Sequence, residues 1–177
     1  MSQTVYRLSQ ISLLIYCIPA KKSTVESGLA FPAFRTYTIL KSINGGMMMA
    51  FTTGLRGTAS TTVTPEKTAA ACGSGSLPVF GTPFLLALME EATCNAVFGA
   101  LEDGQSTVGV SMELQHSAPS PVGMEVWAEA CLTEVNGKML TFSVTAYDQT
   151  GEIGSGTIRR CIIRSEPFLA RCQSKLQ

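Results

Sequence analysis

The segment Thr82–Phe98 constrains the fold more than any other part of the chain, because it predicts a helix that is apolar on every side. Its first two residues are typical of a helix start, where Thr82 serves as the N-cap and Pro83 fits the first turn. At about 100° per residue, apolar side chains fall on both sides: Phe84, Leu88 and Ala92 on one, Leu86 and Val97 on the other. A helix with no polar face is a buried helix.

Two carboxylates, Glu90 and Glu91, interrupt this apolar segment. Burial raises the pKa of a carboxyl group, and acid–base or nucleophilic sites depend on such shifts. Both residues have apolar neighbours three and four positions away, so helical periodicity does not separate a catalytic carboxylate from one at the rim of the helix. The sequence therefore predicts a functional carboxylate here without choosing between the two.

The composition fits one domain with an extension. The chain has 177 residues, of which 45% are hydrophobic and 15% charged, and its formal net charge is +0. A chain of this length buries a full core. Balanced charge without long basic runs argues against nucleic acid as a partner. We divide the sequence into an N-terminal extension at 1–46, expected to be poorly ordered, a domain at 47–166 and a C-terminal tail at 167–177.

The cysteines and the single histidine argue against a metal site. The six cysteines are scattered without a C-x-x-C pair, and His116 is the only histidine in the sequence. Zinc ligands at motif spacing are therefore not expected, and we expect neither a metal nor a cofactor. Dispersed cysteines are typical of proteins in a reducing compartment, which predicts the cytoplasm. The apolar run 11–20 is too short to span a bilayer, so no membrane association is expected.

Strand-like alternation surrounds the predicted helix. One strand is expected before it, at 58–64, and four after it, at 106–116, 125–134, 138–147 and 153–164. Asn136-Gly137 is a strong hairpin signal between two of these strands. The order predicts an α+β fold in which a curved antiparallel sheet wraps a long helix, as in the hotdog architecture. One sheet leaves part of such a helix uncovered, so we expect a homodimer.

His116 stands out because it follows an apolar strand face. It continues an even-numbered series that is expected to face the helix: Val108, Val110, Met112 and Leu114. A histidine on such a face is often a core residue whose hydrogen bonds are satisfied. His116, however, ends the strand just before a loop rich in serine and proline, and functional groups gather where elements end in loops. We therefore treat it as a candidate site residue.

Three more residues have both a structural and a functional explanation. Arg160 shares a strand face with isoleucines and needs an anion there, either a carboxylate of Glu90, Glu91 or a partner subunit, or a ligand. Gly109 interrupts a strand, which indicates a bulge or the close approach of a ligand. Thr82 at a helix N-terminus also lies where free N–H groups favour a developing oxyanion.

These residues together resemble the fluoroacetyl-CoA thioesterase-like branch of the hotdog thioesterases. The similarity runs from about residue 55 to residue 172. It rests on Val79-Phe80-Gly81-Thr82, Leu88-Met89-Glu90, Gly109, His116 with Ala118 and Pro121, and Gly154-Ser155-Gly156-Thr157 with Arg160. The separations of eight positions from Thr82 to Glu90 and 26 from Glu90 to His116 also agree with the family.

The resemblance implies a dimer with two active sites at the subunit interface. Thr82, Glu90 and His116 would be the catalytic residues, and Gly109 and Arg160 would bind substrate. Members specialised for a fluorinated acyl group carry a longer lid with a phenylalanine before the threonine, whereas the segment 72–78 is short here. The implied activity is hydrolysis of an acyl-CoA thioester to free acid and coenzyme A, with the acyl group left open.

Two other functions are compatible with a hotdog domain. A module that binds acyl-CoA without cleaving it would keep the ligand tunnel but would not need Glu90 and His116 together. A hotdog hydratase usually shows an aspartate and a histidine a few residues apart in one loop. His116 has no aspartate within ten positions on either side. The sequence therefore favours a thioesterase over both alternatives.

Overall fold

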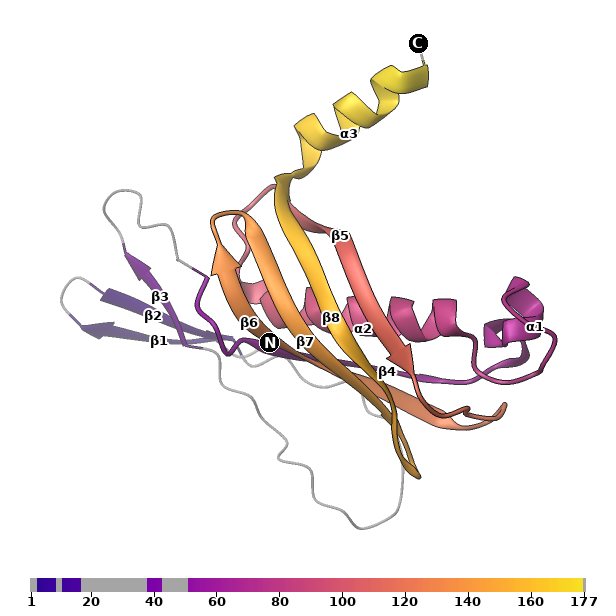
Figure 1. Cartoon of the computed structure of the whole chain (residues 1–177). Coiled ribbons are helices and arrows are strands. Elements are labelled where there is room, and N and C mark those ends of the chain that lie inside the picture. Colours follow the sequence, from indigo (N-terminus) through magenta and orange to yellow (C-terminus); the bar gives the residue numbers. More distant parts are fainter. Residues whose placement is uncertain (1–2, 9–10, 17–37, 43–50, 177) are drawn as a thin grey trace. The chain divides into compact units, whose positions relative to one another are not determined.

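The computed structural model describes residues 3–8, 11–16, 38–42 and 51–176, and the chain divides into two compact units, Met1–Met49 and Ala50–Gln177 (Figure 1). The first unit contains three antiparallel strands in the order β1-β2-β3: β1 (Gln3–Leu8), β2 (Ile11–Tyr16) and β3 (Thr38–Ser42). The domain boundaries drawn from the sequence stay predictions.

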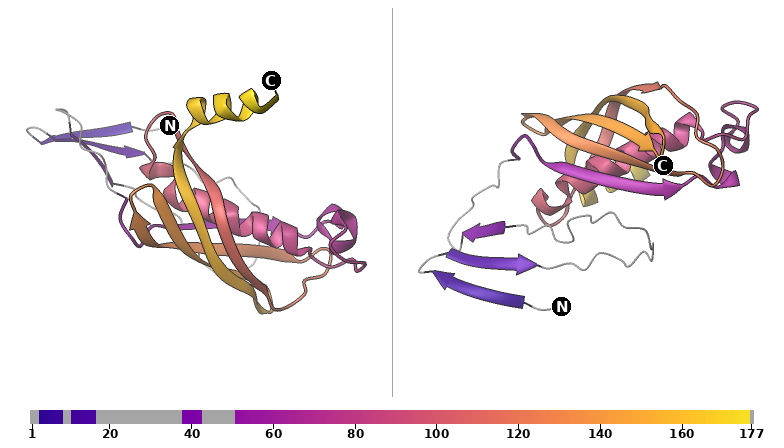
Figure 2. Two further views of the ribbon diagram at one scale, coloured as in Figure 1. Left: turned by 45° about the horizontal axis from the view of Figure 1, so that its top comes forward. Right: turned by 90° about the horizontal axis from the view of Figure 1, so that it is seen from below.

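The second unit holds a five-stranded sheet and one long helix. Its elements are β4 (Arg56–Thr62), η1 (Pro65–Lys67), α1 (Ala69–Cys72), α2 (Thr82–Val97), η2 (Phe98–Ala100), β5 (Gln105–His116), β6 (Glu125–Asn136), β7 (Met139–Asp148), β8 (Gly151–Arg164), α3 (Ser165–Gln173) and η3 (Ser174–Leu176). The sheet is antiparallel throughout, in the order β4-β6-β7-β8-β5. Figure 2 shows it curling around α2. The predicted order of one strand, one helix and four strands is confirmed.

The core forms between α2 and the concave face of the sheet. The helix contributes Leu85, Leu88, Met89, Ala92 and Val97, and the strands contribute Val126, Leu132, Leu140, Phe142, Val144 and Ile158. Each large side chain buried in this way contributes about 2 kcal/mol. Strands β6 and β7 form the expected hairpin, in which Asn136 pairs with Met139 and Gly137 takes the left-handed φ of 58° that the two-residue turn requires.

The helix differs from its prediction in two ways. Its N-cap is Gly81 rather than Thr82, so Thr82 is the first helical residue and its hydroxyl does not cap the helix. Nor is the helix buried on every side in the single chain. A stripe at four-residue spacing is exposed: Pro83, Ala87, Glu91 and Asn95. The reason is that one five-stranded sheet covers only one side of the helix.

Strand β5 reverses its inward face at a bulge. Gly109 pairs with Arg160 and Ser111 pairs with Arg159, which leaves Val110 as an extra residue. The expected single face of Val108, Val110, Met112, Leu114 and His116 is therefore wrong, and Val110 is 57% exposed. Before the bulge, Thr107 and Gly109 face the helix; after it, the even-numbered residues do. The bulge that Gly109 predicted is confirmed.

The remaining features of the second unit concern its surface. Helix α3, which begins two residues before the predicted C-terminal tail, buries none of its residues. Five cysteines are free in the described part of the chain: Cys72, Cys94, Cys131, Cys161 and Cys172. None of the described helices has the length and apolar character needed to cross a bilayer.

Candidate active site

The first residue of α2 and the last residue of β5 meet at Thr82 and His116. Thr82 Oγ1 lies 2.9 Å from His116 Nδ1, and this hydrogen bond joins residues 34 positions apart. The contact arises because the sheet curls until the end of β5 reaches the N-terminus of the helix (Figure 1). Two of the three predicted catalytic residues are therefore neighbours within one chain.

The environment of His116 favours its neutral form. Burial lowers the pKa of His116 below its ordinary value, and the backbone of Ala118 offsets only part of this effect. The second ring nitrogen, Nε2, is buried and has no hydrogen-bond partner in the described part of the chain. A neutral imidazole with one nitrogen beside a hydroxyl is suited to accept a proton from that hydroxyl or from a water.

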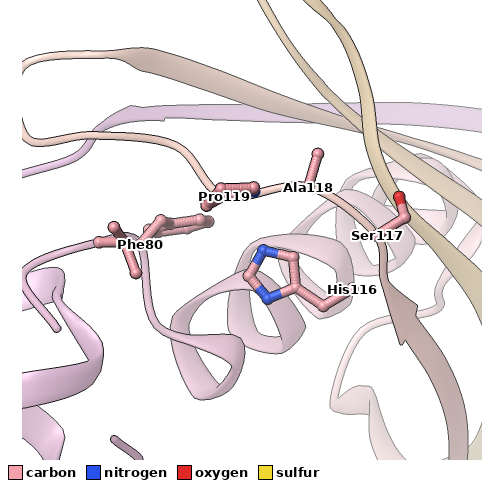
Figure 3. Close-up of a pocket in the computed structure, with 6 residues that line it drawn as sticks. Phe80, His116, Ser117, Ala118 and Pro119 are labelled. Carbon is pink, nitrogen blue, oxygen red and sulfur yellow. The ribbon is translucent and has the colours of Figure 1, made fainter. Parts of the chain in front are cut away.

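A pocket of about 230 Å³ opens beside this histidine. It is lined by residues from two short segments, Val79 and Phe80 before the helix and His116, Ser117, Ala118 and Pro119 after β5. Figure 3 shows the His116 ring extending from the end of the strand toward Phe80. The pocket therefore places the imidazole beside both polar and apolar surface, which suits a small ligand that has an apolar part and a few polar groups.

The second cluster of polar residues lies two turns further along α2. Glu90 Oε1 accepts a hydrogen bond of 2.9 Å from Arg160 Nη1. Arg160 also donates from Nε to Thr107 Oγ1 at 2.9 Å and from Nη2 to the Thr107 carbonyl at 3.0 Å. Arg160 is 5% exposed, whereas the Glu90 side chain is 32% exposed. Of the partners considered for Arg160, the structure shows Glu90.

Gly109 is the reason that the Glu90 carboxylate fits against β5. A Cβ atom at position 109 would lie 2.5 Å from Glu90 Oε1 and 2.6 Å from Met112 Cε. Both distances are shorter than a normal contact, so any larger side chain would displace the carboxylate. Gly109 therefore shapes the space around Glu90, and Glu91, on the exposed side of the helix, has no part in it.

The described chain does not bring Glu90 to His116. Thr82 and Glu90 are eight residues apart on one helix, which corresponds to a rise of about 12 Å. Glu90 is hydrogen-bonded to Arg160 and His116 to Thr82, with no hydrogen bond between the two pairs. In one chain the five predicted site residues thus form two groups, Thr82 with His116, and Glu90 with Gly109 and Arg160.

Sequence reasoning missed Thr107, which holds Arg160 through both its hydroxyl and its carbonyl. The bulge at Gly109 was the available signal, because a bulge reverses the inward face and places Thr107 toward the helix. It also missed the buried pair Ser120 and Asp148, which are hydrogen-bonded at 2.7 Å. Within the described ranges, no group of three or more histidine, cysteine or acidic residues is arranged to hold a metal ion.

Comparison with known proteins assigns the family. The sequence model of the fluoroacetyl-CoA-specific thioesterases (FlK) matches residues 63–166. The chain belongs to this family. The fluoroacetyl-CoA thioesterase of Streptantibioticus cattleyicolor is 39% identical over 97 residues, which cover 55% of this chain and 70% of that relative. The resemblance inferred from the sequence is thereby confirmed.

Solved structures agree with the FlK family assignment. A structure of the fluoroacetyl-CoA thioesterase FlK superimposes with a TM-score of 0.67 at 34% identity, covering 71% of this chain and 98% of that one. A thioesterase superfamily member from Thermus thermophilus gives a TM-score of 0.64 at 28% identity and covers 70% of this chain and 93% of its own. This FlK-family chain is thus a thioester hydrolase with the hotdog thioesterase fold.

Proposed function

We propose that this chain hydrolyses an acyl-CoA thioester to a free acid and coenzyme A, with Thr82, Glu90 and His116 as its catalytic residues. The observation that carries the proposal is the 2.9 Å contact between Thr82 Oγ1 and His116 Nδ1, a histidine that lines the pocket. The relatives are named for fluoroacetyl-CoA hydrolysis, and one FlK mutant was solved in complex with fluoroacetate and CoA. The acyl group that this chain accepts is left open.

The start of α2 is suited to stabilise the oxyanion that forms when a thioester carbonyl is attacked. The N–H groups of Phe84 and Leu85 donate to the Gly81 carbonyl, and Pro83 has no N–H group. The backbone N–H of Thr82 donates to no other backbone group in the described chain, so it is free beside its own hydroxyl. One such donor stabilises a transition state by about 3 to 4 kcal/mol.

His116 and Glu90 would supply the proton transfer and the attack. His116, neutral near pH 7, passes a proton from the water that is consumed in the hydrolysis to the leaving thiolate of coenzyme A. Glu90 either attacks the carbonyl itself or deprotonates a water, and both routes need its carboxylate held in place. Arg160 holds one oxygen of that carboxylate, and Gly109 leaves room for it beside the substrate.

We further propose that the active site is completed in a homodimer. Three observations support this: Glu90 and His116 have no hydrogen bond within one chain, α2 exposes a stripe, and β5 is an edge strand. Near the bulge, β5 exposes Val110 and Met112, and such an edge is suited to pair with another copy. A two-fold dimer would bring Glu90 of one protomer toward His116 of its partner. Localisation in the cytoplasm stays a prediction.

A panel of acyl-CoA esters with detection of free thiol tests the proposed reaction. We expect the wild-type chain to release coenzyme A, Glu90→Gln to release none above background, and Glu91→Gln, one position along the same helix, to match the wild type. Binding of the esters without thiol release would indicate a binding module instead. Loss of the enoyl absorbance without thiol release would indicate a hydratase.

A further inference from the structure

We infer that Ser120 and Asp148 position His116 against Thr82, an inference that rests on the proposed function. Neither residue lines the pocket. Ser120 is fully buried and Asp148 is 3% exposed. Their hydrogen bonds nevertheless fix the two short segments that form the pocket wall. They act through His116 and are positioning residues, not catalytic ones.

The loop after His116 is closed into a ring by Asp148. Ser120 Oγ donates to Asp148 Oδ2 at 2.7 Å, which ties the far end of the loop to the end of β7. At the near end, the N–H groups of Ser117 and Ala118 donate to the Ile153 carbonyl at 2.9 and 3.3 Å. Both ends of the loop that follows the imidazole are therefore anchored to the β7–β8 turn and the strand after it.

Asp148 also fixes the turn that carries these anchors. Its second oxygen, Oδ1, accepts hydrogen bonds from the Thr150 backbone N–H at 2.8 Å and from Thr150 Oγ1 at 2.6 Å. The turn leads directly into the start of β8 and to the Ile153 carbonyl. One oxygen of the carboxylate thus holds the far end of the loop, and the other holds the turn that leads to the strand anchoring the near end.

The same loop is attached to the segment before Thr82. The Phe80 N–H donates to the Ser120 carbonyl at 2.9 Å, and Val79 forms a bridge with Pro121. Since Phe80 lies two residues before Thr82, Ser120 connects the histidine loop to the threonine by a short path. The 2.9 Å contact between Thr82 and His116 therefore depends on where Ser120 is held.

The carboxylate at position 148 is charged in spite of its burial. Burial by itself would raise the pKa of Asp148, but hydrogen bonds from Thr150, Ser120 and Gly151 together lower it below its ordinary value. No lysine or arginine pairs with it in the described chain. An asparagine there would have only one acceptor oxygen. Its NH2 group would then face either the Ser120 hydroxyl or the Thr150 donors, which need an acceptor. The two arms of the network thus require an aspartate.

The test uses the fact that His116 is the only histidine of the sequence. When the protein is prepared without a histidine tag, its imidazole NMR signals come from His116 alone. Their titration gives the pKa of this residue without any activity measurement. We expect Ser120→Ala to move these signals. It should also raise the pKa of His116 toward the ordinary value of a histidine, because a loosened loop admits water to the imidazole. The turnover number should fall about ten- to hundredfold, with a smaller change in KM.

Two control variants separate positioning from general stability. Ser120→Thr keeps the hydroxyl and should restore both the imidazole signals and turnover. Thr133→Ala removes a hydroxyl that donates to the Thr141 carbonyl at 3.0 Å, toward the other end of β7, and should move neither. Unchanged imidazole signals and an unchanged His116 pKa in folded Ser120→Ala would overturn the inference. If those signals move while the wild-type chain cleaves no acyl-CoA ester, the positioning stands and the proposed function fails.

Discussion

Gly109 on β5 lies so close to Glu90 on α2 that a single added Cβ atom would stand 2.5 Å from the carboxylate oxygen. This approach follows from the bulge at Val110, which turns the face of residue 109 toward the helix. The oxygen concerned is the one that Arg160 holds. The glycine, the bulge and the ion pair therefore form one arrangement that sets where the carboxylate lies.

Gly109→Ala should displace the Glu90 side chain and reduce turnover without unfolding the chain. The atoms that the new Cβ would meet are the ends of two flexible side chains, so the backbone need not move. We expect thioester hydrolysis to fall about ten- to hundredfold, measured by thiol release. Gly99→Ala is the matched control, because a Cβ there meets nothing within 4 Å. Equal turnover in the two variants would contradict the role assigned to Gly109.

Arg160→Met should cost both stability and activity. It removes the hydrogen bonds to Glu90 and Thr107 and leaves the carboxylate without its partner. Because the Glu90 side chain is 32% exposed, water compensates in part, and we expect unfolding free energy to fall by about 1 to 3 kcal/mol. Denaturant unfolding measures this loss, and thiol release measures the activity. Arg159→Met, on the exposed face of the same strand, should change neither.

Gly57→Ala should destabilise the fold, because β4 lies against α2 at this position. A Cβ there would collide with the backbone of Ala92 and Ala96, which cannot move without shifting the helix. Overpacking of this kind costs about 1 to 3 kcal/mol. Gly75→Ala is the control, because the nearest atom to a Cβ there would be 3.5 Å away. Comparing the thermal unfolding of the two variants isolates the effect of the clash with α2. A melting temperature equal to that of the control would show that α2 tolerates the displacement.

The titration of His116 predicts a pH dependence with a definite sign. Its pKa is lowered in the folded state, chiefly by burial, so between that value and 6.5 the unfolded chain binds more protons than the folded one. This contribution to stability is therefore complete above 6.5 and is lost as the pH falls through the folded pKa. The stability of His116→Gln should lack this component in denaturant unfolding from pH 5 to 8. If the unfolding free energy of the wild-type chain rose relative to that of His116→Gln as the pH fell, the predicted sign would be wrong.

The elements of the second unit could be predicted because their signals are local. The start signal and apolar run of α2 and the alternation of the strands depend only on neighbouring residues, and Asn136-Gly137 marks the hairpin directly. The face of β5 could not be read in the same way, because the extra residue Val110 reverses the alternation half-way along the strand. The cap was assigned to Thr82 on composition, whereas the backbone places Gly81 there.

The contacts of the candidate site depend on how distant segments meet. Arg160 on an apolar face indicated an anionic partner, and the structure supplies Glu90, 70 positions away. Nothing local identified Ser120 and Asp148, since serine and aspartate are common in loops and turns for their own hydrogen bonds. Their pairing across 28 positions depends on the register of β6 and β7, which places Asp148 opposite Val126 at the start of β6.

The central claim, a site shared between two protomers, is tested most directly by mixing two inactive variants. Glu90→Gln and His116→Gln chains are unfolded together, refolded together, and assayed for thiol release. If Glu90 of one protomer works with His116 of its partner, each mixed dimer regains one intact site, and activity should return to about a quarter of the wild-type value. If the mixture stays as inactive as either variant alone although mixed dimers form, the two residues do not act across a subunit boundary, and the proposed site is wrong.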